Sequence, residues 1–359
     1  MWIAISIATI IVSLLAFLYL IKAVSRFGLI SKINPKWLKN LVAALIIVLC
    51  FAGFTIALGV VNAMVILVYV LAFFVISGII VRIIQKITGK TSAIYLQGWL
   101  AIIISIIHLS CAYYLCHNVW RTEYNLSTDK AVNGLHMALI ADSHLGTTFG
   151  GEGFAKWMKQ IESDNPDLLL IAGDYVDNSS KKADMIRACE ALGDMNLKYG
   201  VYFAYGNHDK HAFGGRDFSV EDLENELIKN GVHILEDEFI ELDNLSIVGR
   251  KDFVTEKRQD ISDLLKNVDE DKYIVVIDHE PTDYENECES PADVVVSGHT
   301  HGGQLLAIKY FGEWSGINDR TYGYERRNKT DFIVTSGISD WALDFKTGTK
   351  SEYVMINVN

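Results

Sequence analysis

The sequence predicts an α/β domain with two packed β-sheets, preceded by a membrane region of four helices. Charge divides the chain, because the first of its 44 acidic residues is Glu123 while nine of its 32 basic residues come earlier. Hydrophobicity divides it at the same place, since apolar runs long enough to cross a bilayer occur only before Glu123. After it, short apolar runs typical of strands alternate with helical segments. A chain of 359 residues has room for both parts.

The first 116 residues form the predicted membrane region. A helix needs about 20 apolar residues to cross a hydrocarbon core. Segments of about that length are 2–21, 41–60, 62–81 and 94–116. Gly59 and Asn62 allow a turn between the middle two. Helices buried in a soluble core would not exclude every carboxylate over 122 residues. No basic residue precedes the first run, so we expect it to remain as an anchor and not to be cleaved as a signal peptide.

Orientation in the membrane follows from the basic residues. Lysine and arginine collect in 22–39 and 82–90, whereas the turn near Asn62 has no charge. Basic loops stay on the cytoplasmic side. Four spans then place both chain ends, and the acidic domain, outside the cytoplasm of a cell-membrane protein. One span more or fewer would move the domain to the other side.

Residues 117–134 are polar and form the predicted linker, and 135–359 form the predicted domain. Helices are expected around 154–161, 183–195 and 220–230. The expected strands are 136–141, 168–172, 201–204, 239–242, 245–248, 273–277, 293–297, 332–335 and 353–358. The strands after residue 231 favour a second sheet packed on the first. Residues 311–329 are expected to form an irregular loop or hairpin near the site. Cys189 and Cys288 could form a disulfide, although the apolar stripe around Cys189 equally fits a buried free thiol.

Five short polar blocks carry the functional signal, and most of them stand where a predicted strand ends. They are Asp142-Ser143-His144, Gly173-Asp174, Gly206-Asn207-His208-Asp209, His279 and Gly298-His299-Thr300-His301. An open α/β sheet presents side chains to its ligand at the carboxyl ends of its strands. Each block alone is a weak motif, but all five in one chain are difficult to explain as solvated loops.

The blocks contain seven candidate metal ligands: Asp142, His144, Asp174, Asn207, His279, His299 and His301. Asp142 and His144 alternate by two, so on an extended backbone both point the same way. Asp174 has two carboxylate oxygens, which makes it the best candidate to bridge two cations. Mixed His, Asp and Asn ligation fits Mn, Fe, Zn or Co. Two such divalent ions would attract a phosphate and activate a hydroxide for attack on phosphorus.

Beside these ligands, His208 is the candidate proton donor. We expect it to protonate the leaving oxygen, with Asp209 or another carboxylate orienting its ring. The alternative is that His208 only supports its loop. Arg326, Arg327 and Lys329 could reach a substrate phosphate, although a basic loop in an acidic domain is more often solvated.

At these residues the chain resembles the calcineurin-like metallophosphoesterase family, over about 135–359. The resemblance implies a four-layer α/β/β/α sandwich with a two-metal site and His208 as the catalytic histidine. It implies that one ion is held by Asp142, His144, Asp174 and His301. It implies that the other ion is held by Asp174, Asn207, His279 and His299. Asp177 matches the Gly-Asp-x-x-Asp form of the family and is expected to support the site.

The segment His299 to Gln304 resembles the membrane-anchored branch of this family, some of whose members cleave lipid-linked or nucleotide-sugar phosphoesters. The chain departs from that branch near its end, where Lys346 and Ser351-Glu352 stand in place of an Arg and a Pro-Glu pair.

The sequence therefore predicts a membrane-anchored, binuclear metallophosphoesterase whose substrate is lipid-linked or membrane-proximal. The alternative is a non-catalytic sensor, in which the domain only binds metal or ligand on a membrane module. Residues from Glu123 onward carry 23 basic against 44 acidic side chains, a net charge of −21. This charge argues against long nucleic acid as a partner.

Overall fold

The computed structural model describes residues 14–132, 134–210 and 215–359, in two compact units, one up to Ala112 and one from Tyr113 to Asn359. The first unit contains helices α2 (Gly28–Ser31), α3 (Lys36–Leu58), α4 (Val60–Thr88) and most of α5 (Leu96–His117). In the described part of the chain, α3, α4 and α5 are long and apolar enough to cross a membrane. A shorter apolar helix covers Leu14–Val24, and the rest of the expected first span lies outside the described residues.

The turn between α3 and α4 lies at Gly59, within the stretch that the sequence indicated. Gly59 has φ +84°, a value that favours glycine. It is both the C-cap of α3 and the N-cap of α4. Helix α4 continues past Arg82 to Thr88, beyond the expected end at residue 81, and stops before Gly89, which has φ +69°. Its last turns therefore carry Arg82 and Lys86, two of the three basic residues that the sequence assigned to a loop.

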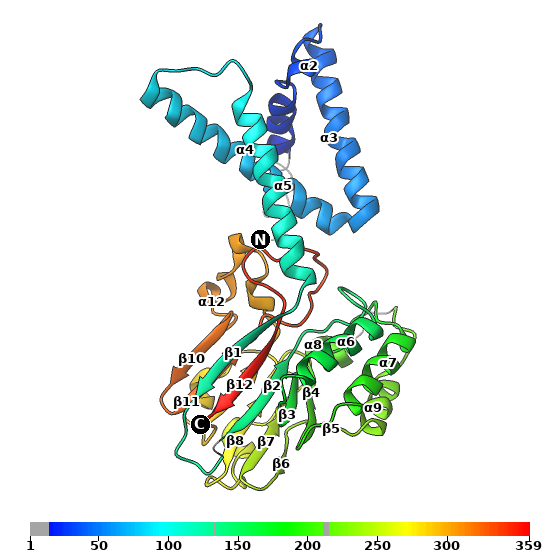
Figure 1. The fold of residues 1–359 in the computed structure, drawn as a ribbon, viewed down its shortest axis with the longest axis vertical. Helices are drawn as coiled ribbons and strands as arrows, with labels where there is room; N and C mark the ends of the chain where they lie inside the picture. Colours follow the sequence, from blue (N-terminus) through cyan, green and yellow to red (C-terminus); the bar gives the residue numbers. More distant parts are fainter. Residues whose placement is uncertain (1–13, 133, 211–214) are drawn as a thin grey trace. The chain divides into compact units, whose positions relative to one another are not determined.

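The second unit is built on two six-stranded sheets (Figure 1). The first sheet has the order β1 (Trp120–Leu126), β12 (Glu352–Val358), β2 (Leu135–Ile140), β3 (Leu168–Ala172), β4 (Gly200–Ala204) and β5 (Val232–Ile234). The second has the order β10 (Gly323–Arg327), β11 (Thr330–Val334), β9 (Val294–Ser297), β8 (Tyr273–Ile277), β7 (Leu245–Gly249) and β6 (Glu238–Glu241). Strands β2 to β5 are parallel to one another, as are β7, β8, β9 and β11.

Alternate residues of each strand belong to different apolar cores, which makes the unit a four-layer sandwich. Leu169 and Ile171 of β3 pack with the helices α6 (Gly151–Glu162), α7 (Lys182–Gly193) and α9 (Val220–Lys229), which cover the outer face of the first sheet (Figure 1). Leu168 and Leu170 point the other way, into the core between the sheets. A third core joins the second sheet to α10 (Ile261–Leu264) and α11 (Tyr284–Glu287). The expected α/β/β/α architecture is confirmed.

The expected linker contains an edge strand of the first sheet. Strand β1 pairs in parallel with β12 over seven residues, from Trp120 opposite Glu352 to Leu126 opposite Val358. The strand was not predicted because four of its seven residues, Arg121, Thr122, Glu123 and Asn125, are polar. All of these side chains except that of Thr122 are exposed, as an edge strand permits. The compact unit accordingly begins at Tyr113 and not near Leu135.

Two smaller uncertainties are settled by the fold. Cys189 and Cys288 are free, and Cys189 is buried in the core beneath the helices. Residues 311–329 contain α12 (Phe311–Ser315) and strand β10, which forms a hairpin with β11.

A buried ion cluster anchors α11 to the second sheet. The Nη1 atom of Arg250, which follows β7, donates hydrogen bonds to Asp278 Oδ2 (3.0 Å), Asp283 Oδ2 (2.8 Å) and Glu287 Oε1 (3.0 Å). Arg250, Asp278 and Glu287 are almost completely buried. Because Asp278 directly precedes His279, this cluster also fixes one wall of the site described next.

Candidate metal centre

The structure brings all seven expected ligands together at one end of the two sheets. Asp142 and His144 follow β2, Asp174 follows β3, and Asn207 follows β4 at the start of α8 (Asn207–Lys210). The second sheet contributes His279 after β8, and His299 and His301 after β9, with His301 opening the short helix η1 (His301–Gly303). The carboxyl ends of parallel strands therefore supply the entire set, as expected for an α/β fold.

The ligand atoms form two groups with Asp174 between them. His144 Nε2 lies 3.6 Å from Asp174 Oδ2, and His144, Asp142 and His301 form one group that can hold an ion. His279 Nε2 lies 3.3 Å from the same Asp174 oxygen, and these two residues form the second group with His299. The Oδ1 atom of Asn207 lies 3.1 Å from His299 Nδ1. Asp174 Oδ2 thus lies within 3.6 Å of a histidine nitrogen from each group.

The donor atoms at this site fit a cation. His144 is completely buried, and neither of its nitrogens has a hydrogen-bond partner among the described residues. His279 Nδ1 lies 2.7 Å from the carbonyl oxygen of Ala172 and donates to it, so His279 Nε2 presents a lone pair to the Asp174 carboxylate. Burial also lowers the pKa of His144 to about 4, which keeps this ring neutral and able to ligate. Facing lone pairs of this kind are stabilised by a divalent ion between them.

The backbone at the ligands is left-handed and not extended, which corrects one expectation. Asp142 has φ +53° and His144 has φ +36°, while His299 and His301 have +69° and +49°. The two-residue spacing therefore does not work through strand alternation; each of these side chains leaves a left-handed backbone position after its strand. Non-glycine residues in this region cost roughly 1 to 3 kcal/mol each and cluster at functional sites.

Two glycines allow the strand ends to approach one another. Gly173 has φ +76°, and a Cβ atom there would lie 2.5 Å from His279 Nδ1 and 2.6 Å from the Gly206 nitrogen. A Cβ atom on Gly206 would lie 2.4 Å from Asp174 Oδ1. Any side chain at either position would therefore displace Asp174 or His279.

His208 is oriented by Asp177, which is the other carboxylate that the sequence left open, and not by Asp209. His208 Nδ1 lies 3.0 Å from Asp177 Oδ1, and the His208 ring centroid is 4.9 Å from that of His144. Burial alone would lower the pKa of His208, but the hydrogen bond to Asp177 and the charge of Asp174 raise it above its ordinary value. His208 is thus placed beside the ligand groups with its ring held by a carboxylate.

Asp209 has a structural role instead. Its carboxylate accepts hydrogen bonds from the backbone nitrogens of Asp174 (2.9 Å), Tyr175 (2.9 Å), Val176 (3.1 Å) and Gly206 (2.8 Å). The side chain is completely buried. Asp209 therefore holds the ends of β3 and β4 together. Its contact with the site is the hydrogen bond from the backbone nitrogen of Asp174.

Asp340 is a site residue for which no sequence motif gave a signal. Its Oδ1 atom lies 3.5 Å from His301 Nδ1, and neither atom has a hydrogen-bond partner among the described residues. On its other side, Asp340 Oδ2 accepts a hydrogen bond from Cys116 Sγ (3.3 Å) and lies 3.8 Å from Lys346 Nζ. Lys346 is buried and donates to the carbonyl oxygen of Ser336 at 2.6 Å. The Lys346 ammonium therefore supports the loop that carries Asp340, which lies next to His301.

The basic loop considered for phosphate binding lies away from the site. The turn between β10 and β11 precedes β11, so it lies at the amino end of the second sheet, whereas the ligands follow the carboxyl ends. Arg326 pairs with Asp331 (3.4 Å), and Arg327 pairs with Glu325 (2.6 Å). These arginines therefore stabilise the hairpin.

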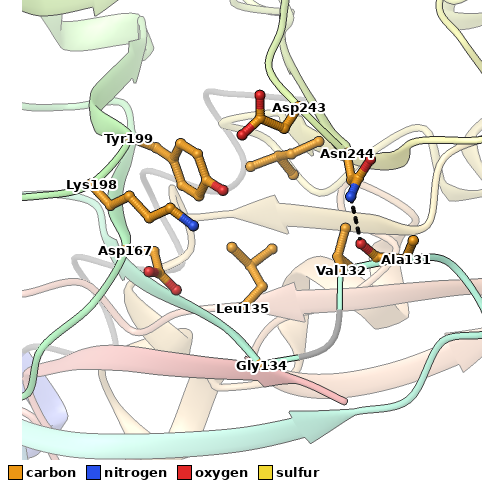
Figure 2. A pocket seen from close by; sticks show the side chains of 10 residues that line it. Ala131, Val132, Gly134, Leu135, Asp167, Lys198, Tyr199, Asp243 and Asn244 are labelled. Carbon is orange, nitrogen blue, oxygen red and sulfur yellow. Dashed lines mark hydrogen bonds between the residues drawn. The ribbon is translucent and has the colours of Figure 1, made fainter.

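A cavity of about 270 Å³ also lies at the amino end of the strands. Figure 2 shows Asp167, Lys198, Tyr199 and Asp243 around it, with Asn244 Nδ2 donating to the Ala131 oxygen (2.9 Å). None of the expected metal ligands lines this cavity. The expected metal ligands therefore lie at the opposite end of the sheets from this cavity.

Comparison with known proteins agrees with this geometry. The family model described as calcineurin-like phosphoesterase matches residues 135–303. An uncharacterized metallophosphoesterase of Aquifex aeolicus is 30% identical over 196 residues, which cover 52% of this chain and 72% of that protein. Another, from Campylobacter jejuni, is 26% identical over 307 residues, 81% of this chain and 78% of that protein.

A membrane relative is also similar. A transmembrane protein with metallophosphoesterase domain from Danio rerio is 26% identical over 243 residues, which cover 63% of this chain and 54% of that protein. Together with α3, α4 and α5, this likeness suggests a membrane protein. The chain belongs to the calcineurin-like metallophosphoesterase family and is a phosphoester hydrolase whose ligand groups suit divalent metal ions.

Proposed function

We propose that this protein is a membrane-anchored phosphoesterase that uses two divalent ions to cleave a lipid-linked or membrane-proximal phosphoester outside the cytoplasm. The observation that carries the proposal is the convergence of six candidate ligands around a seventh, Asp174, in a chain with three candidate spans. Mixed nitrogen and oxygen ligation favours Mn, Fe, Zn or Co.

The two ions divide the ligands on the two sides of Asp174. Asp142, His144 and His301 would hold one ion with Asp174. Asn207, His279 and His299 would hold the other with the same carboxylate. Bound there, divalent ions activate water and neutralise charge on the phosphoryl oxygens.

The protein supplies the remaining chemistry through His208. The ring lies beside His144, and its Nδ1 atom is engaged by Asp177. Its Nε2 atom is therefore the one that donates a proton to the leaving oxygen. Asp177 stabilises the protonated ring and fixes its orientation.

The last turn of α5 belongs to the catalytic unit, and this supports a substrate at the membrane. Helix α5 ends at His117, and strand β1 begins at Trp120. The backbone nitrogen of Ser351, next to β12, donates to the Leu115 oxygen of α5 (2.9 Å). The end of a candidate span is thus hydrogen-bonded within the catalytic unit.

Metal analysis combined with turnover tests the proposal. Full-length protein in detergent should contain about two metal ions per chain and, with Mn, should hydrolyse nitrophenyl phosphomonoesters or phosphodiesters. Asp174→Asn should remove most of both the metal and the turnover, because it removes the shared ligand. Asp243→Asn, an exposed carboxylate at the opposite end, is the matched control. Full metal content without turnover on a broad phosphoester panel would contradict the proposal and support the binding-only alternative.

Orientation needs its own experiment. The two basic segments are retained in the cytoplasm, which places the chain end after Asn359 outside it. Alkaline phosphatase fused after Asn359 should therefore be active. A fluorescent protein that is exported unfolded should be dark when fused at the same place. The reverse pattern would place the catalytic unit in the cytoplasm.

A further inference from the structure

An exposed apolar segment follows the metal-binding loop directly. It consists of six large side chains between residues 305 and 317, all exposed: Leu306, Ile308, Tyr310, Phe311, Trp314 and Ile317. Trp314 on α12 is 80% exposed. Scattered apolar side chains are ordinary on a protein surface, but a concentration over so short a stretch marks an interaction site.

The apolar segment follows the His301 loop in the chain and is fixed to residues 347–348 by hydrogen bonds. The Gln304 oxygen accepts hydrogen bonds from the backbone nitrogens of Thr347 (2.9 Å) and Gly348 (3.1 Å). The Leu306 nitrogen donates to Thr347 Oγ1 (2.9 Å), and Lys309 Nζ donates to the Gly348 oxygen (2.9 Å). The position of the segment relative to the metal ligands is thereby defined.

The end of the last candidate span is held at the same place. Ser351, three residues after Gly348, donates through Oγ to the Cys116 oxygen (2.6 Å). The ring of Tyr113 lies 6.2 Å from that of Phe345. These contacts lie within the catalytic unit, where the last turn of α5 and α12 are at the same end (Figure 1). Because α5 has no charged residue before its final turn, its end marks the surface of the bilayer.

The composition of the apolar segment suits a bilayer interface. Tryptophan and tyrosine rings favour the headgroup level, and short apolar helices insert shallowly there. Of the two charged side chains in the segment, Glu313 is turned inward, where its Oε1 atom accepts a hydrogen bond from the Thr321 nitrogen (2.6 Å). Lys309 lies over the rings of Tyr310 and Tyr322, at 5.5 and 5.3 Å. A cation at this level is attracted by anionic headgroups.

We propose that the apolar segment inserts into the interface of the bilayer that α5 crosses. The anchor and the segment then hold the catalytic unit at two places, with the metal loop between the segment and the strand ends. The inference deepens the proposed function and rests on it for the substrate: the enzyme takes phosphoesters embedded in the bilayer in preference to dissolved ones.

Fluorescence quenching tests the insertion without any turnover. Full-length protein is placed in phosphatidylcholine and phosphatidylglycerol nanodiscs with brominated acyl chains, and quenching of tryptophan emission is compared with Trp314→Phe. The quantity compared is the emission per protein that is lost when brominated lipid replaces ordinary lipid. Removing Trp314 should make this loss smaller, because a quenched fluorophore is removed, and the other tryptophans are common to both proteins and cancel in the difference.

Trp157→Phe is the matched control, since Trp157 lies on α6 and packs against the domain core. Its removal should leave the emission loss unchanged, because Trp157 contributes no quenched emission. If Trp314→Phe likewise left the loss unchanged, the segment would face water or another protein chain, and the insertion would be overturned.

A pair of substrates tests the consequence for catalysis. The triple variant Leu306→Ser, Phe311→Ser and Trp314→Ser should lose about tenfold or more of the activity on a long-chain alkyl nitrophenyl phosphodiester embedded in vesicles. Hydrolysis of soluble bis-nitrophenyl phosphate should stay within about twofold of wild type. Ile228→Ser on α9, a similarly exposed apolar residue, should change neither rate.

Two outcomes separate the hypotheses. An equal loss on both substrates would overturn the role of the segment in lipid-borne catalysis. Wild-type protein that cleaved neither substrate would contradict the proposed function, while the quenching experiment would still decide the insertion.

Discussion

Asp177 Oδ1 lies 3.0 Å from His208 Nδ1, so a carboxylate from the loop after β3 orients a ring from the start of α8. Asp209, the next residue in the chain after His208, points away from that ring, and its carboxylate accepts hydrogen bonds from four backbone nitrogens. The two aspartates therefore have separable roles, one in the proton transfer and one in the fold.

Asp177→Asn should slow the cleavage of alkyl phosphoesters by about 100-fold, because it weakens the proton donor for a poor leaving group. Nitrophenyl esters, whose leaving oxygen needs no proton, should be slowed by no more than about threefold. Steady-state rates on the two classes check this, with Asp243→Asn as control. An equal loss on both classes would mean that His208 does not protonate the leaving oxygen.

Asp209→Asn should destabilise the catalytic unit by about 3 kcal/mol or more, because an amide nitrogen would face backbone donors that now bond to a carboxylate oxygen. Thermal unfolding in detergent measures the effect. Asp177→Asn provides the comparison and should leave the unfolding temperature close to that of wild type. Equal shifts in the two variants would show that Asp209 does not hold the strand ends.

Asp340→Asn should weaken metal binding by about tenfold or more, because Asp340 is the carboxylate nearest to His301 Nδ1 and acts as a positioning residue for that ring. Metal retained per chain, measured over a series of free Mn concentrations, checks this independently of turnover. Asp344→Asn removes a carboxylate from the same loop and should leave the titration unchanged. Unaltered metal retention in Asp340→Asn would remove Asp340 from the site.

Arg250→Ala should cost about 3 to 5 kcal/mol of stability, because it leaves the buried Glu287 without its cation and leaves Asp278 paired only with Arg258. Arg187→Ala breaks a pair with the exposed Glu152 and should cost far less, because water screens an exposed pair. Denaturant unfolding compares the two. Similar costs would show that the buried cluster contributes no more than a surface pair.

Metal removal should lower the unfolding temperature by roughly 5 to 10 °C, because ions that bind only the folded protein stabilise it. Scanning with and without chelator measures this. Asp174→Asn, already depleted of metal, should show little further change. A chelator effect of the same size in that variant would point to metal bound elsewhere.

The sequence predicted the two-sheet fold and the position of the ligands because both depend on local signals. Runs such as Leu168 to Ala172 are strongly apolar, and the polar block that follows each one marks the end of the strand. Strand β1 was not predicted, because its exposed polar residues break the apolar pattern and its partner β12 is more than 200 residues away in the chain. No local rule indicates such a pairing.

The chemistry of individual ligands was predictable from residue type, but their conformation was not. Alternation by two at Asp142 and His144 suggested a strand, whereas the positive φ angles come from the close approach of neighbouring strand ends. Adjacency in sequence favoured Asp209 as the partner of His208, while the fold supplies Asp177. Asp340 becomes visible only as a buried carboxylate beside His301.

The parallel pairing of β1 with β12 determines where a water-soluble fragment of this enzyme can begin. A fragment starting at Leu135, where the family resemblance starts, would lack β1 and leave the backbone donors and acceptors of β12 open along one side. Open strand edges of this kind recruit other chains and aggregate. Truncation before Trp120 keeps β1 on β12, and the exposed charges of Arg121 and Glu123 on β1 oppose pairing with another chain. The choice of first residue therefore decides whether the fragment stays in solution.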